Sequence, residues 1–173
     1  MVEYAMPADA ARDLLTVVRA NGASVCVGGG WGVDALVGEQ TREHADLDLW
    51  VEAADTEKVF AAFVDCGVDR IYPWPGDRPW NFVVHDSGSR RVDLRFYETF
   101  DGHRLRYGNA AHPFIFEGRD LPGRGEIAGM PVRCETPEFA LANHAGYELC
   151  DTDRHDIATL CDRFDLPPPQ VRL

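Results

Sequence analysis

The sequence predicts an α/β (α+β) fold, a small mixed β-sheet core with C-terminal helices. Two observations predict it. In the first part of the chain, segments with apolar residues at helical spacing alternate with short segments of strand character, and the last part contains only two helical segments. The length of 173 residues fits a single domain, which we divide into a core (about 1–134) and a C-terminal helical part (about 135–173).

The first elements lead into a run of three glycines. A helix is predicted over 7–20, where apolar residues recur at helical spacing, and a short apolar strand over 25–27. The glycine run, residues 28–30, follows this strand at once. Residues 31–37 then suffice for about two turns of helix before Gly38 stops it.

The middle of the chain supplies further strands. Residues 46–51 alternate acidic and apolar side chains, which is typical of a half-buried strand. A capped helix over 56–63 follows. Residues 80–85 and 91–96 are predicted to form a hairpin around a polar turn at 86–89.

The second half of the chain contains one ambiguous segment. Residues 97–122 are rich in aromatics, His and Gly, and we expect them to be mostly loop. A second small hairpin is predicted over 126–134. A helix with Thr as its cap and Pro at its first position is predicted over 136–149. Residues 151–153 are expected to separate it from a last helix that ends near 164.

The composition limits the classes of partner. The formal net charge of -12 argues against a nucleic acid partner, because phosphate backbones are bound by an excess of Lys and Arg. The same charge suits a cationic small substrate, although solubility alone also explains it. We expect no membrane span and no secretory signal. The five scattered cysteines indicate buried free thiols, so we expect a cytoplasmic protein.

The glycine run has the composition of an anion site. Glycines let backbone N–H groups approach a ligand closely, and the N-terminus of a helix adds partial positive charge. Gly28, Gly29 and Gly30 lie between a predicted strand and a predicted helix. We therefore predict that they bind the phosphates of a nucleoside triphosphate.

Two acids on the next strand suggest a metal site. Asp46 and Asp48 are two residues apart, so on a strand both point to the same face. Side-by-side carboxylates raise each other's pKa unless a cation lies between them, and Mg²⁺ prefers carboxylates, water and substrate phosphates. An ordinary solvent-facing strand is the alternative. The glycine run about sixteen residues earlier favours the metal site.

A third acid lies on a later alternating strand. Asp93 is flanked by apolar residues in the segment 92–96, and a neighbouring strand would bring it beside Asp46 and Asp48. Three acids on adjacent strands can hold two Mg²⁺ ions, and a hydroxyl near one of them can lose its proton. Asp86 and Glu98 compete for this third role, and the strand position favours Asp93.

A dinucleotide-binding motif is the main alternative for the glycine run. Residues 30–35 match G-x-G-x-x-A, and Glu52 falls near the acidic position that such a motif expects. A parallel crossover needs a longer helix than Gly38 allows here. We therefore do not expect a dehydrogenase.

Several segments together resemble one known family. Residues 27–38 and 40–49 resemble the signature of the antibiotic nucleotidyltransferases, that is, the lincosamide nucleotidyltransferases and the related aminoglycoside adenylyltransferases of the polymerase-beta-like superfamily. The resemblance continues in residues 91–94, 127–134 and 144–157, so it covers most of the chain. The last block is closer to the small lincosamide enzymes.

The resemblance implies roles for the residues already singled out. Asp46 and Asp48 would ligate Mg²⁺, and Asp93 would be a third ligand or the general base. Gly29 and Gly30 would contact the triphosphate of ATP or another nucleoside triphosphate.

The resemblance also places two residues of the intervening loop near the nucleotide. Arg42 and His44 would lie near the phosphates or the sugar, or else would order the loop. An ion pair between Asp34 and Arg42 would fix that loop.

The acceptor is less well defined. Trp80 belongs to an aromatic and proline-rich segment that would wall an acceptor pocket or pack on the sheet. The carboxylate of Glu98 would attract a cationic drug. His144 and Tyr147, three apart on a predicted helix face, would border the cleft or be ordinary partly buried residues.

The resemblance implies transfer of a nucleoside monophosphate to a hydroxyl of a small-molecule antibiotic, with the lincosamide type favoured. An aminoglycoside or another small molecule is the first alternative acceptor. A minimal nucleotidyltransferase that acts as an antitoxin on a partner protein is the second. Small family members often pair, so we expect a homodimer.

Overall fold

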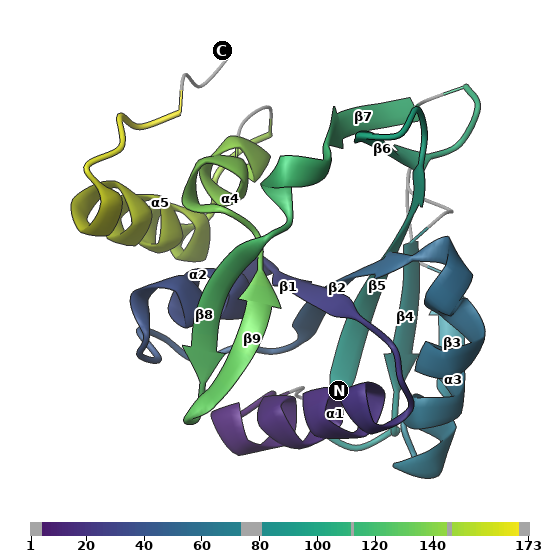
Figure 1. The fold of residues 1–173 in the computed structure, drawn as a ribbon. Helices are drawn as coiled ribbons and strands as arrows, with labels where there is room; N and C mark the ends of the chain where they lie inside the picture. Colours follow the sequence, from purple (N-terminus) through teal and green to yellow (C-terminus); the bar gives the residue numbers. More distant parts are fainter. Residues whose placement is uncertain (1–4, 74–80, 112, 145–146, 170–173) are drawn as a thin grey trace.

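A computed structural model describes residues 5–73, 81–111, 113–144 and 147–169 (Figure 1). Its elements in chain order are α1 (Ala8–Ala20), β1 (Val25–Gly28), α2 (Gly29–Val37), β2 (Leu47–Glu52), η1 (Ala53–Asp55), α3 (Thr56–Asp65), β3 (Arg70–Pro73), β4 (Asn81–His85), β5 (Arg91–Thr99), β6 (Arg104–Gly108), β7 (Pro113–Glu117), η2 (Gly118–Asp120), β8 (Gly123–Ile127), β9 (Met130–Cys134), α4 (Pro137–Asn143) and α5 (Asp151–Phe164). The predicted mixed α/β fold is confirmed.

One mixed sheet organises the molecule. Its main strand order is β3-β4-β5-β2-β1-β9-β8, and β6 and β7 extend it from the end of β5. The central strand β2 pairs antiparallel with β1 and parallel with β5. In this register Gly28 is the partner of Asp48, and Asp48 is in turn the partner of Asp93. The sheet therefore brings the glycine run and two of the predicted acids into one row.

The helices form two groups around the sheet (Figure 1). Helices α1 and α3 bury their apolar faces against the strands in the main core, where Leu14 and Phe63 are almost fully buried. Helices α2, α4 and α5 lie together, and a smaller core joins Val33 of α2 to Leu160 of α5. Because Trp31 belongs to the main core, α2 connects the two cores. No helix within the described residues has the length and apolar character that a bilayer span requires.

A third cluster corrects the prediction for residues 97–122. Instead of mostly loop, these residues extend β5 to Thr99 and add the hairpin of β6 and β7. Leu105, Tyr107 and Phe116 of this hairpin pack around Trp50 of β2. The alternation of Arg with apolar residues over 104–107 is a strand signal, and its inward side chains bury against an indole that is distant in sequence.

Two helix boundaries also differ from the prediction. Helix α4 ends at Asn143 rather than near 149. Residues 151–153 do not separate two helices but form the first turn of α5, where Asp151 and Asp153 suit the positive end of the helix dipole. Thr136 caps α4 as predicted, with its hydroxyl accepting from the N–H of Phe139.

The cysteines are free thiols, as predicted. The expectation that they are buried holds only for Cys26 and Cys134, and Cys150 is exposed. The dinucleotide alternative is excluded by topology, because β1 and β2, on either side of the fingerprint helix, are antiparallel. A dinucleotide fold requires them to be parallel.

Candidate active site

A polar cavity of about 210 Å³ opens where α2 begins. Residues of β2, β5, α4 and α5 also line it. Its wall includes Gly29 and Gly30 from the glycine run and Asp46 and Asp48 from the start of β2. The glycine run and the two acids, about sixteen residues apart in the sequence, thus meet at one cavity.

The glycine run is held close to polar side chains. Gly29 has a left-handed φ of 56°, and a Cβ at this position would collide with the carboxylate of Asp48. A Cβ on Gly30 would stand 2.6 Å from Nδ1 of His44 and closer still to the guanidinium of Arg42. Only glycine therefore lets the first turn of α2 approach Asp48, Arg42 and His44.

The three predicted acids converge. Asp48 and Asp93 are direct register partners on the parallel strands β2 and β5, and Asp46 lies just before β2. Burial, followed by repulsion from the neighbouring carboxylate of Asp48, raises the pKa of Asp46 to about 6. Burial, followed by repulsion from Asp48 and Asp46, raises the pKa of Asp93 to about 7. Of the two competing third acids, Asp86 lies in the β4–β5 turn and pairs with Arg90.

Two arginines of β5 form ion pairs with these acids. Nη2 of Arg95 lies 2.6 Å from Oδ1 of Asp48. Arg91 bridges the other two acids, with Nη2 at 3.1 Å from Oδ2 of Asp93 and Nη1 at 3.6 Å from Oδ2 of Asp46. Neither arginine was singled out from the sequence, although both alternate with Asp93 along the strand.

The donor set suits a hard divalent cation. The three acids offer oxygen ligands only, and the buried Oδ1 of Asp93 has no hydrogen-bond partner among the described residues. Within the same residues, no group of three or more His, Cys, Asp or Glu side chains is arranged as a finished metal site. Instead, ion pairs with Arg91 and Arg95 direct carboxylate oxygens of Asp93 and Asp48 toward guanidinium groups.

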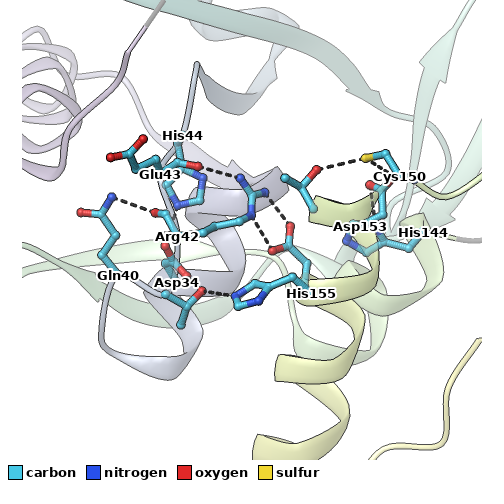
Figure 2. Close-up of polar contacts among 12 residues, drawn as sticks. Asp34, Gln40, Arg42, Glu43, His44, His144, Cys150, Asp153 and His155 are labelled. Atoms are coloured by element: carbon cyan, nitrogen blue, oxygen red, sulfur yellow. Dashed lines mark hydrogen bonds and ion pairs between the residues drawn. The ribbon is translucent and has the colours of Figure 1, made fainter.

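The loop that precedes β2 is fixed by partners other than the predicted one. Asp34 does not pair with Arg42. It accepts from Thr41 at 2.5 Å and contacts Nε2 of His44 at 2.5 Å. Arg42 instead forms two hydrogen bonds with Asp156 of α5 (Figure 2). The prediction failed because Asp156 lies 114 residues further along the chain. Both Arg42 and His44 line the cavity, next to the glycine run.

Glu135 is a wall residue that the sequence did not reveal. It is almost fully buried, and its Oε1 accepts from Nε1 of Trp50 at 2.5 Å and from Nδ2 of Asn143 at 3.0 Å. Burial raises its pKa to about 7. A single acid between a strand and a helix start carries no pattern, and its partners come from separate elements.

The four predicted acceptor residues do not share one location. His144 and Tyr147 both line the cavity, with Nδ1 of His144 3.1 Å from the hydroxyl of Tyr147. The two side chains are in contact although α4 ends before both residues. The prediction that they share a helix face was therefore wrong. Glu98 is not part of the cavity wall and pairs with Arg106 at 2.7 Å. Trp80 lies outside the described residues.

Sequence comparisons give two matches. The family model described as aminoglycoside-2''-adenylyltransferase matches residues 11–160. A lincosamide resistance protein of Staphylococcus haemolyticus is 29% identical over 133 residues, which cover 76% of this chain and 80% of the relative.

Solved structures give similar results. The lincosamide antibiotic adenylyltransferase LnuA, solved with lincomycin bound, matches with a TM-score of 0.72 and 27% identity, over 86% of this chain and 92% of that one. ANT(2'')-Ia, in complex with adenylyl-2''-tobramycin, matches with a TM-score of 0.71 over 90% of this chain and 87% of that one. At 22% identity, the second match is a likeness of fold alone.

Proposed function

The chain belongs to the aminoglycoside-2''-adenylyltransferase family of nucleotidyltransferase enzymes, and from this premise we propose that it transfers AMP from ATP to a hydroxyl of a lincosamide-type antibiotic, with Mg²⁺ as cofactor. The observation that carries the proposal is the row formed by Gly28, Asp48 and Asp93 across three neighbouring strands. It joins a phosphate-binding turn to a set of carboxylates.

Asp46, Asp48 and Asp93 are the residues that would hold Mg²⁺. When bound, the ion would neutralise the negative charge that develops on the phosphates during transfer. The free Oδ1 of Asp93 is the atom on which the proton of the acceptor hydroxyl would be held. The row of strands fixes Asp48 and Asp93 relative to each other, so the reacting groups are positioned before the substrates bind.

The start of α2 and the loop before β2 would bind the nucleotide. The backbone of Gly29 and Gly30 lies at the positive end of α2, and Arg42 and His44 lie directly against it. We propose that these groups hold the triphosphate, with Arg42 as the charged donor. His144 and Tyr147, which line the same cavity, would contact the acceptor or the nucleoside.

The comparisons favour a lincosamide acceptor. The lincosamide relative and LnuA share 29% and 27% of aligned residues with this chain. The description of the matching family supports an aminoglycoside as the second candidate. A mass-spectrometric screen separates them: the protein is incubated with ATP, Mg²⁺ and either lincomycin or tobramycin, with chelated samples as the control.

We expect an AMP adduct of lincomycin that is lost on chelation of the metal. If only tobramycin forms an adduct, the acceptor is an aminoglycoside and the lincosamide proposal is wrong. Adducts of neither drug would contradict the proposal for both classes.

Our proposal includes a cytoplasmic homodimer that does not bind nucleic acid. The acid excess, 29 Asp and Glu against 17 Lys and Arg, supports the last point. Size-exclusion chromatography with light scattering tests the dimer, and a molar mass of one chain would contradict it.

A further inference from the structure

We infer that Asp156 of α5 is a positioning residue for nucleotidyl transfer, because it holds Arg42 in the orientation that receives the triphosphate. The inference rests on the proposed function. It concerns a helix that follows the catalytic strands in sequence and contributes none of the three acids. Asp156 was not among the site residues expected from the sequence.

The contact between the two residues is bidentate. Nε of Arg42 donates to Oδ1 of Asp156 at 2.8 Å, and Nη2 donates to Oδ2 at 2.7 Å. The side chain of Asp156 is 2% exposed and that of Arg42 is 21% exposed. Two parallel hydrogen bonds fix the plane of a guanidinium as well as its position, which a single contact cannot do. Asp156 therefore sets the direction in which Arg42 faces.

The fixed guanidinium still has capacity for a ligand. Nη1 of Arg42 donates to the carbonyl of Glu43 at 3.0 Å (Figure 2). Among the described residues, the three hydrogen bonds leave two of the five N–H groups for another acceptor. The group lies against Gly30 and lines the cavity, so an anion at the start of α2 would meet it.

Asp156 also opposes a competing attraction. The carboxylates of Asp34 and Asp46 both act electrostatically on Arg42. Asp46 is a proposed metal ligand and already pairs with Arg91. Without Asp156, the guanidinium would be drawn toward Asp34 and Asp46, and at Asp46 it would compete with the cation instead of binding phosphate. The buried carboxylate thus keeps the guanidinium beside Gly30, away from the carboxylates that would hold the cation.

A second chain of contacts from the same helix restrains the same loop. His155 Nε2 lies 3.0 Å from the hydroxyl of Thr41. Thr41 donates to Asp34, which contacts His44 (Figure 2). Consecutive residues of α5 therefore support both loop residues that face the nucleotide, and Leu160 anchors the helix in the core.

The test compares Asp156→Asn with Asp162→Asn, an exposed position on the same helix. Affinity for a non-hydrolysable ATP analogue with Mg²⁺ is measured by calorimetry, which needs no acceptor. We expect Asp156→Asn to weaken the affinity by about tenfold, as for other supporting contacts, and Asp162→Asn to leave it unchanged. In turnover assays the KM for ATP should rise while the KM for the acceptor stays constant.

A double-mutant cycle isolates the route of the effect. If Asp156 acts through Arg42, Asp156→Asn should add nothing to the loss caused by Arg42→Lys. Additive losses, unchanged affinity in Asp156→Asn, or equal rises of both KM values would overturn the inference.

If Asp156→Asn does not fold, Asp156→Glu retains the charge with altered geometry. Asp156→Glu should weaken the affinity for the ATP analogue by several fold, and unchanged affinity would again overturn the inference. A wild-type protein that binds no analogue would instead contradict the proposed function.

Discussion

At the scale of single residues, the three acids are balanced by two arginines of β5. Arg95 pairs with Asp48, and its guanidinium also lies 5.4 Å from the ring centre of Trp50. Arg91 bridges Asp46 and Asp93. These guanidinium groups lower the repulsion among the three carboxylates, and they contact the oxygens that Mg²⁺ would use.

Competition between Arg95 and the metal is directly measurable. We expect Arg95→Met to bind Mn²⁺ about tenfold more tightly than wild type in the absence of nucleotide, equivalent to about 1.4 kcal/mol, because one competing positive charge is removed. Mn²⁺ titration followed by electron paramagnetic resonance gives the affinity. Arg106→Met removes an ion pair outside the cavity wall and should leave it unchanged. Equal or weaker binding by Arg95→Met would exclude this competition.

Local residue chemistry also explains which site residues the sequence could predict. Asp48 and Asp93 each alternate with apolar neighbours, so the strand period alone places each of them on the face opposite those neighbours. The partners of Arg42 and Glu135 come from α4, α5 and β2, and no local pattern connects these segments. Contacts of this kind depend on tertiary packing, which the local sequence does not specify.

At the scale of elements, the strands and helices with strong periodicity matched the sequence. Helix α1 begins within one residue of its predicted start, and β2 and β5 lie where alternation indicates strands. The helix predicted over 136–149 was too long, because α4 ends at Asn143 with His144 as its C-cap. The hairpin of β6 and β7 was missed because its many aromatics suggested loop, whereas they pack on Trp50.

That packing predicts a difference between two phenylalanines of β7. Phe116 is 6% exposed, with its ring centre 5.1 Å from that of Phe139, whereas Phe114 is 45% exposed. We expect Phe116→Ala to lower the free energy of unfolding by about 3–5 kcal/mol, because it leaves a cavity beside Trp50. Phe114→Ala, the matched control, should lower the free energy of unfolding by less than half as much. Urea unfolding measures both, and equal losses would show that the cluster does not stabilise the hairpin.

At the scale of the whole molecule, buried acids make stability depend on pH. The pKa values of Asp46, Asp93 and Glu135 are raised to about 6, about 7 and about 7. Their values in the unfolded chain are about 4. Between about pH 4 and about pH 7, the folded state therefore holds more protons than the unfolded state, and stability must fall as the pH rises. Acids with lowered pKa values, such as Asp86 and Asp153, change the stability with pH mainly below this window.

Thermal unfolding across this window checks the linkage. Without divalent cations, we expect the melting temperature to fall as the pH rises from about 4 to about 7. Asp93→Asn should show a smaller fall, because one of the three raised groups no longer titrates. Added Mg²⁺ should raise the melting temperature most at the upper end of the window, where the carboxylates are charged. A melting temperature that rises with pH would contradict the assigned burial of these acids.

The central claim is that Asp48, held between the glycine run and Asp93, serves nucleotidyl transfer. The most direct test measures AMP transfer from ATP to the best acceptor by wild type and by Asp48→Asn, with near-ultraviolet circular dichroism as the control for folding. We predict that Asp48→Asn keeps the wild-type spectrum and loses at least about 10²–10³-fold in turnover. A correctly folded Asp48→Asn variant with near-wild-type turnover would contradict the account.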